Sequence, residues 1–413
     1  MNELARATPS HPNARRPAPG HLLVDREIEC LIGTAVRPVE GAGAIARAQL
    51  QASSLDLRLG PVAYRIRAGF LPGRTPIGER LAELETSRLS LEHGGAVLEK
   101  GLVYLVPLEE ELALPADLAA TFNPRSSTGR CDVFTRILVE DHPRVHAAPA
   151  GYHGKLWLEV APLSFPVRLL RGDRLAQARF FRGEPALDSD ELRAIYARTP
   201  LCYVGDRPVP IEEVRFDGEG GLELHLGLRD RDPSGWRAQS HTGVLDFGRE
   251  GAHSIEDFWE AVHSPAGHSI LAPGSFYLFA SRERVVVPPE LAAEMLPVDV
   301  DIGELRNNYA GFFDNGFGWH DEPERRGTPA VLEVRAHDVP FLVEDGQVFF
   351  RLRYFRTSGA PERLYGAGRG GTSYRDQDLT PARCFRPGAP AREGPGARAR
   401  EGPGAGAREG GNR

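Results

Sequence analysis

The chain has 413 residues, of which 41% are hydrophobic and 26% are charged, a composition typical of a globular protein of two or three domains. Its 50 basic and 57 acidic side chains leave a net charge of -7, which argues against general nucleic-acid binding. The four cysteines are widely spaced and form no CxxC pair. The sequence therefore predicts neither a zinc site nor a disulfide framework, and we expect a reducing, cytoplasmic environment.

The two ends of the chain predict no folded structure. Residues 1–20 lack the apolar run of a signal peptide, and no stretch of about 18 apolar residues could span a bilayer, so we expect neither export nor membrane insertion. Residues 388–413 repeat a Gly/Pro/Arg/Glu unit without bulky apolar side chains. Such a composition predicts a disordered tail, and we expect residues 1–20 to be a disordered extension as well.

Between the two ends, strands dominate the predicted elements. Two helices are expected, at DREIECLIG (25–33) and at SIEDFWEAV (254–262). Short runs rich in β-branched and aromatic residues, bounded by Gly, Pro and Asp turns, predict strands. These runs are LWLEV (156–160), FPVRLL (165–170), AQARFF (176–181), VLEV (331–334) and QVFFRLRYF (347–355). Many short strands with few helices favour a mainly β protein built as barrels or sandwiches.

The chain also resembles itself. Residues 103–122 match residues 276–296, and residues 157–181 match residues 331–355 at nearly the same offset of about 173 residues. A repeat of this length is too long for a solenoid and normal for a domain. We therefore expect two tandem domains, over residues 21–198 and 199–387.

One loop has the composition of an anion site. NPRSSTGR (123–130) carries Arg125 and Arg130 around two serine hydroxyls. Arginine offers a planar fork of donors and serine a compact one, which suits a phosphate group. The loop also fits an ordinary turn with solvated arginines, because Ser, Asn, Pro and Gly are turn residues.

Several segments occur in the order typical of one enzyme family. They are LVDREIECLI (23–32), ASSLDLRLG (52–60), LPADLAATFNPRSSTGR (114–130), AGYHGKLWLEV (150–160) and GDRLAQARFF (172–181). Together they resemble the dCTP deaminases of the dUTPase-like superfamily. The resemblance is fainter in the second half, where DNGFG (314–318), VLEV (331–334) and TSYRDQ (372–377) carry it.

The resemblance implies two tandem dUTPase-like β-clip or barrel domains with a few short helices, in a trimer-like homo-oligomer. It implies a hydrolase that acts on a cyclic amidine C–N bond and converts dCTP to dUTP and ammonia, supplying dUTP for thymidylate synthesis. It further implies Mg²⁺ bound through the triphosphate, no catalytic metal, and dTTP as an inhibitor. No nucleic-acid or membrane partner is expected.

Deamination at C4 of cytosine needs an activated water, a proton shuttle and stabilised charge. The sequence lacks the H-x-E and P-C-x-x-C signature of zinc deaminases, so a carboxylate must act as the base. The resemblance assigns this role to Glu159, the attacking water to Ser126 and charge stabilisation to Arg130. The plain alternative for Glu159 is an outward-facing strand residue.

The same resemblance implies a set of substrate-binding residues. Arg125 and Ser127 would contact the triphosphate, and Tyr152 would pack against the deoxyribose. Gly151 and Gly154 would let the backbone approach the nucleotide closely, Gln177 would face it, and Tyr374 and Gln377 would close over the base and phosphates. Solvated arginines, a half-buried tyrosine and an outward-facing glutamine are the plain alternatives.

Two departures from the family pattern bear on the reaction. Pro149 stands where the family has an aspartate that a dUTP diphosphatase would use, which favours deamination alone. The second copy keeps Asp314, but its counterpart of the phosphate loop, PVDVDIGELR (297–306), is acidic. Acidic residues repel phosphate, so we expect a degenerate second domain with Glu333 as a relic or a structural residue.

A sharper hypothesis is a composite pocket that combines the first copy's loop and Glu159 with the second copy's closing segment. The alternatives that remain open are a dUTP diphosphatase of the same superfamily and a non-catalytic nucleotide-sensing protein on this fold. Ser126, Arg130 and Glu159 occur together in the first copy, which weighs against the sensor, because a sensor needs no base.

Overall fold

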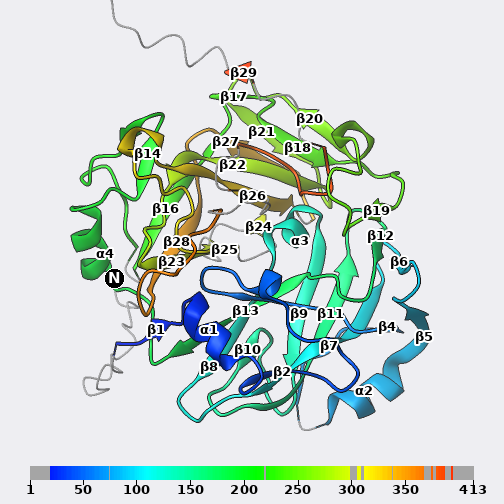
Figure 1. Ribbon diagram of the computed structural model, residues 1–413. Coiled ribbons are helices and arrows are strands. Elements are labelled where there is room, and N and C mark those ends of the chain that lie inside the picture. Colours follow the sequence, from blue (N-terminus) through cyan, green and yellow to red (C-terminus); the bar gives the residue numbers. More distant parts are fainter. Residues whose placement is uncertain are drawn as a thin grey trace, which may run out of the picture.

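The computed structural model describes residues 19–73, 75–217, 220–297, 305–307, 311–336, 338–366, 374, 378–386 and 392–393. Within these ranges the protein is mainly β with a few short helices, as the sequence predicts. Figure 1 shows the first half of the chain, blue to cyan, below the second half, green to orange.

The first half is built on two sheets. The larger has the order β5 (Glu85–Ser90), β4 (Val62–Ile66), β7 (Val103–Ala113), β11 (His153–Pro162), β9 (Val133–Val139), with β2 (Val36–Pro38) paired to β7. The smaller has the order β1 (His21–Leu22), β13 (Ala176–Arg182), β8 (Ala119–Pro124), β10 (Ala147–Ala148), with β3 (Leu55–Leu57) paired to β13. The strands expected at 156–160 and 176–181 are confirmed as parts of β11 and β13.

The second half is built on one large sheet. Its main path is β15 (Arg207–Pro208), β14 (Cys202–Val204), β22 (Phe276–Val285), β16 (Gly221–Gly227), β28 (Val348–Arg356), β23 (Leu291–Pro297), β25 (Phe312–Phe313). Joined to that path are β18 (Gly235–Ala238), β20 (Trp259–Val262), β26 (Thr328–Ala336) and β24 (Leu305–Asn307). Two strand pairs are separate: β17 (Arg231–Asp232) with β29 (Arg392–Glu393), and β21 (His268–Leu271) with β27 (Phe341–Glu344).

The helices are α1 (Asp25–Leu31), α2 (Ile77–Leu84), α3 (Ser126–Arg130) and α4 (Ser189–Tyr196), with 3-10 turns η1 (Arg47–Gln49), η2 (Ile255–Asp257) and η4 (Pro323–Arg325). The helix expected near residue 25 is confirmed as α1. The helix expected at 254–262 is wrong: after η2 the chain continues as β20, which pairs with β18 and buries Trp259 in the core. Among the described helices, none is long and apolar enough to cross a membrane.

The strand pairing repeats between the halves. β7 pairs antiparallel with β11 in the first half, and their counterparts β22 and β26 pair antiparallel in the second. β8 pairs with β13, and β23 pairs with β28 in the same sense. The matching segments of the sequence therefore form matching strand pairs.

The two halves share their packing. β12 (Val167–Leu169) pairs antiparallel with β6 (Ala96–Leu98) and parallel with β19 (Leu245–Asp246) of the second half. The main hydrophobic core of the first half also contains second-half side chains, including Trp259, Phe276 and Phe385. Since burial of such side chains is the main stabilising contribution to folding, the halves depend on each other and hold fixed positions at their junction.

Candidate active site

The basic loop forms α3, which lies where the two halves meet (Figure 1). Arg125 is extended, and its backbone N–H donates to the carbonyl of Leu175 at 2.8 Å. Inside α3, the Thr128 hydroxyl donates to the same carbonyl at 2.8 Å. Both bonds tie the loop to the start of β13, so the side chains of Ser126 and Arg130 project from a fixed support.

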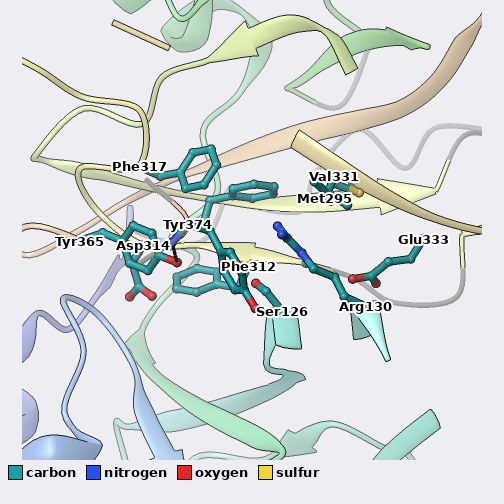
Figure 2. Close-up of a pocket in the computed structure, with 12 residues that line it drawn as sticks. Ser126, Arg130, Met295, Phe312, Asp314, Phe317, Val331, Glu333, Tyr365 and Tyr374 are labelled. Atoms are coloured by element: carbon teal, nitrogen blue, oxygen red, sulfur yellow. Dashed lines mark hydrogen bonds between the residues drawn. The ribbon is translucent and has the colours of Figure 1, made fainter. Parts of the chain in front are cut away.

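A recess of about 450 Å³ opens beside α3. Its polar lining combines Ser126 and Arg130 of the first half with Asp314 and Glu333 of the second half. Its remaining lining comes from the second half: Met295, Gly311, Phe312, Phe313, Phe317, Val331, Tyr365 and Tyr374. Figure 2 shows that these residues surround one space, with Arg130 between Glu333 and the aromatic side chains.

Glu333 lies on β26 at the wall of the recess and is 7% exposed. Its carboxylate lies against the backbone of Gly129, in the last turn of α3. Burial raises the pKa of Glu333 to about 8, an effect that Arg130 opposes and the carboxylate of Asp132 reinforces. A carboxyl group with this pKa exchanges protons readily near neutral pH.

Arg130 is held by the C-terminal segment of the chain. Its Nη1 donates to the carbonyl of Thr380 at 2.8 Å, and its guanidinium lies 3.9 Å from the centre of the Tyr374 ring. The Tyr374 hydroxyl hydrogen bonds the Ser127 hydroxyl at 2.7 Å. The structure thus brings Tyr374, Ser127 and Arg130 together at the recess, as the composite-pocket hypothesis expects for Tyr374.

Residues 378–386 anchor this C-terminal segment. The indole N–H of Trp236 donates to the carbonyl of Leu379 at 3.2 Å, and the ring of Phe385 packs edge to face on Phe258 at 5.5 Å. Leu379 and Phe385 also belong to the main hydrophobic core. The segment is therefore packed into the protein at its far end. Gln377, which the sequence also assigns to it, lies outside the described residues.

Asp314 follows β25 and lies at the other side of the recess from Glu333 (Figure 2). Its Oδ1 accepts from the backbone N–H of Ser53 at 2.9 Å and from the Ser53 hydroxyl at 3.1 Å. Burial raises its pKa to about 6, although the hydrogen bonds from Ser53 lower it. The nearby Ser54 hydroxyl bonds both Asp314 and Oε1 of Gln177, so Gln177 is buried behind the site and does not line the recess.

Glu159 does not line the recess with Ser126 and Arg130. It lies on β11, 2% exposed, where its Oε1 accepts from Nε and Nη2 of Arg136 at 2.9 and 2.6 Å. Its carboxylate also lies against Gly69, and the backbone of Phe70 bonds it. Burial raises its pKa, and Arg136 lowers it. In this chain the structure places Glu333, rather than Glu159, beside the basic loop.

Three more residues that the sequence assigns to the nucleotide, Gly151, Tyr152 and Gly154, do not line the recess. The Tyr152 hydroxyl donates to the carbonyl of Lys155 at 2.9 Å and accepts from the N–H of Glu140, and burial raises its pKa to about 12. Gly151 has a φ of 74°, and Gly154 faces the Tyr152 hydroxyl. Both glycines are needed for the turn that holds Tyr152. Gly151 has a backbone conformation that favours glycine, and a side chain on Gly154 would collide with the Tyr152 hydroxyl.

The other two residues predicted to bind phosphate, Arg125 and Ser127, already have partners within the protein. Arg125 forms an ion pair with Asp56 at 3.1 Å and donates to the carbonyl of Arg174. Ser127 is buried under Tyr374. Within the described ranges, no three His, Cys, Asp or Glu side chains come together as ligands for a metal ion.

The sequence singles out both glutamates, and the structure places Glu333, not Glu159, at this recess. VLEV around Glu333 matches LEV around Glu159, and DNGFG around Asp314 matches PAGYH around Tyr152. The signal for the second-half residues was therefore present. A sequence shows the order of the motifs along the chain, but it does not show which copy of each motif faces which loop.

The fold and the recess together define a class of protein: a mainly β protein whose recess combines a buried carboxyl group of raised pKa, an arginine and a serine hydroxyl. Two family models match almost the whole described chain. The model described as "2'-deoxycytidine 5'-triphosphate deaminase (DCD) N-terminal domain" matches residues 20–184, and the corresponding C-terminal domain matches residues 189–385.

Three similar proteins are also named as dCTP deaminases. The dCTP deaminase of Haloarcula marismortui is 31% identical over 190 residues, 45% of this chain and 85% of that protein. A protein of Beutenbergia cavernae named "dCTP deaminase, dUMP-forming" is 31% identical over 111 residues, 26% of this chain and 53% of that protein. The crystal structure of 2'-deoxycytidine 5'-triphosphate deaminase from Agrobacterium tumefaciens has a TM-score of 0.74 and 41% identity, covering 83% of this chain and 99% of that one.

The chain belongs to the dCTP deaminase family. It is accordingly a hydrolase of the class that acts on C–N bonds, as the sequence predicts.

Proposed function

We propose that the protein hydrolyses dCTP to dUTP and ammonia in this recess, with Glu333 as the general base. The observation that carries this proposal is the position of the Glu333 carboxylate, buried in one half of the chain and opposed to Ser126 and Arg130 of the other. In this proposal Glu333 takes the role that the sequence had assigned to Glu159.

The chemistry follows from these three groups. The ionised carboxylate of Glu333 takes a proton from a water held by the Ser126 hydroxyl, and the oxygen of that water bonds to C4 of cytosine. Glu333 passes this proton to N3 of the ring, takes a second proton from the new C4 hydroxyl and delivers it to the leaving nitrogen, so that the C4 carbonyl forms, the C4–N bond breaks and ammonia departs. The guanidinium of Arg130 stabilises the charge that develops at the reacting centre. A pKa of about 8 suits Glu333 to both proton transfers.

The apolar wall fits the sugar and the base. The rings of Phe313 and Phe317 meet edge to face at 4.8 Å, and Tyr365 packs beside Phe317 at 5.9 Å. We propose Phe317 as the ring that packs on the deoxyribose, since it follows Asp314 as Tyr152 follows Pro149. A close aromatic face excludes a 2'-hydroxyl by leaving it no room and no hydrogen-bond partner.

The other parts of the account rest on the family resemblance. We propose that Mg²⁺ enters with the triphosphate, that dCTP and dUTP are the nucleotide partners, and that dTTP inhibits. A trimer-like homo-oligomer and a cytoplasmic location belong to the same set of proposals, as do contacts of Gln377 with the phosphates.

A second candidate function is hydrolysis of dUTP to dUMP and pyrophosphate. Asp314 favours it, because the second half supplies to the recess the aspartate that Pro149 replaces in the first half. Several similar proteins are named as dUMP-forming deaminases. The Asp314 carboxylate, however, accepts hydrogen bonds from Ser53 and Ser54, which suits a positioning role better than activation of water. Deamination therefore remains the first candidate.

The test is product analysis of the purified protein with dCTP and, separately, dUTP, each with Mg²⁺. Ammonia and dUTP from dCTP, with dUTP left intact, support the first candidate. Release of dUMP and pyrophosphate, lost in an Asp314→Asn variant, would establish the second activity. No product from either nucleotide would contradict both and favour the nucleotide-sensing alternative.

A further inference from the structure

A second contact between the halves lies next to Glu333. Arg335 follows Glu333 by two residues on β26 and therefore points to the same side of the strand. Asp132 follows Arg130 by two residues. Nη2 of Arg335 donates to Oδ2 of Asp132, and the Ser164 hydroxyl donates to the same oxygen at 2.6 Å. Asp132 is fully buried, so this is a buried ion pair that joins α3 to β26.

The backbone of Asp132 is in an uncommon conformation. Its φ is +53°, in the left-handed region that non-glycine residues seldom occupy. Such a residue persists where its surroundings over-determine it, and the conformation clusters at functional sites. Here the Asp132 N–H donates to the carbonyl of Gly129 at 2.8 Å and its carbonyl accepts from Leu163, so the backbone is fixed on both sides.

We propose that Asp132 and Arg335 are positioning residues for the reaction: their ion pair holds β26 against α3 and sets how readily Glu333 accepts a proton. The inference rests on the proposed function, in which Glu333 is the base.

The groups around Glu333 explain why this pair matters. Among the described residues, the charged side chains that act on Glu333 are Arg130 at the end of α3 and Asp132 just after it, and Glu333 in turn acts on the Cys131 thiol. Arg335 lies two residues further on the same strand and pairs with Asp132. Burial raises the pKa of the Cys131 thiol, which is therefore neutral. Asp132 raises the pKa of Glu333 and Arg130 lowers it. Arg335 pairs with Asp132 and offsets its charge, so we expect removal of Asp132's charge to lower the pKa of Glu333 and removal of Arg335's charge to raise it.

The experiment is the pH profile of kcat/KM for dCTP in Asp132→Asn, Arg335→Gln and the double variant. Asparagine tolerates the left-handed backbone and still accepts from Ser164 and Arg335, so Asp132→Asn removes mainly charge. Because Glu333 must be ionised to act, kcat/KM rises with pH through its pKa. The acidic limb of this profile is the part in which kcat/KM rises with pH. We expect it to move to lower pH by about 0.5–1 unit in Asp132→Asn and to higher pH by a similar amount in Arg335→Gln. In the double variant it should return towards its position in the wild type.

Three further variants serve as controls. Asp217→Asn removes a carboxylate from another ion pair, with Arg351 at 2.9 Å, and should leave the limb in place. Ser164→Ala removes a neutral donor from Asp132 and should lower stability with little shift of the limb. Arg335→Lys keeps the charge but loses the planar fork, so it should lower kcat without the shift of Arg335→Gln. If Arg335→Gln does not fold, the downward shift of the limb in Asp132→Asn remains the test.

Acidic limbs that stay unchanged, or that move in the same direction in Asp132→Asn and Arg335→Gln, would overturn the proposal. A Glu333→Gln variant separates this failure from that of the proposed function. If Glu333→Gln is inactive and the limbs do not move, the pair has no positioning role. If Glu333→Gln keeps wild-type turnover, Glu333 is not the base and both proposals fall.

Discussion

The carboxyl carbon of Glu333 lies 2.6 Å from the position that a Cβ atom would occupy on Gly129. The two residues are about 200 positions apart in the sequence and belong to opposite halves. Real Cβ atoms do not approach other atoms this closely, so the glycine is what allows the carboxylate to reach the α3 backbone. This contact links the basic loop directly to the proposed base.

A Gly129→Ala variant should lose activity while it keeps its fold. The backbone of Gly129 is helical and accepts alanine, which has the higher helix propensity. The added methyl group meets the flexible end of Glu333, which must swing away from Ser126 and Arg130. We expect kcat for dCTP to fall about 100-fold or more, with a change in unfolding free energy of about 1 kcal/mol or less.

The matched control is Gly78→Ala in α2, where the new methyl group meets no atom within 4 Å. This variant should keep wild-type kcat. Ammonia release and urea unfolding measure both properties for the two variants. Full activity of Gly129→Ala would show that the Glu333 carboxylate need not lie at this place.

The stability of the protein should carry a pH signature of Glu333. Its folded-state pKa of about 8 lies above that of a glutamate in an unfolded chain, about 4.3. As pH rises between these values, the unfolded chain releases this proton and the folded protein keeps it, so this group lowers the free energy of unfolding. Glu333→Gln removes the effect, and its stability relative to the wild type should increase from pH 5 to pH 8 by up to about 4 kcal/mol.

Urea unfolding of both proteins at pH 5, 6, 7 and 8 measures this difference, and Glu344→Gln, at an exposed position on β27, is the control. A difference between Glu333→Gln and the wild type that stays constant over this range would mean that the folded protein holds Glu333 ionised throughout.

Tyr374 has two separable contacts at the site. Tyr374→Phe removes the hydroxyl that bonds Ser127 and accepts from the backbone N–H of Arg383, but keeps the ring under Arg130. We expect a rise in KM for dCTP of about 2–10-fold, the effect of one or two hydrogen bonds, with kcat nearly unchanged. Tyr374→Ala also removes the ring and leaves Arg130 less constrained, so kcat should fall as well. Steady-state kinetics of both variants measure these effects, and wild-type kcat and KM in Tyr374→Ala would exclude a role for the C-terminal segment.

Much of the fold was predictable from local patterns. The strands at 156–160 and 347–355 have short runs of apolar and aromatic residues, and segments that match at a nearly constant offset form matching strand pairs. The segment 254–262 misled because Ser254 followed by acidic residues is typical of a helix start. Tertiary packing decides there: burial of Trp259 and pairing with β18 outweigh the local helix signal.

The candidate site was only half predictable. Ser126, Arg130 and Tyr374 were recognised by residue type and order, and all three line the recess. The choice between Glu159 and Glu333 depended on which of their two strands lies at the recess between the halves. The sequence does not show this, because LWLEV and VLEV have the same local pattern. Glu159 pairs with Arg136 instead, and no pattern around residue 159 distinguishes a carboxylate held by an arginine from one held in a reaction site.

The most direct test of the account compares ammonia release from dCTP by Glu333→Gln and Glu159→Gln, each shown to be folded. Glu333→Gln keeps the size of the side chain but cannot accept the proton of water, so we expect its kcat to fall about 1,000-fold or more. Glu159→Gln changes a carboxylate that lies outside the recess and should retain most of its turnover. The reverse result, an inactive Glu159→Gln beside an active Glu333→Gln, would contradict a site built from the loop of the first half and the glutamate of the second.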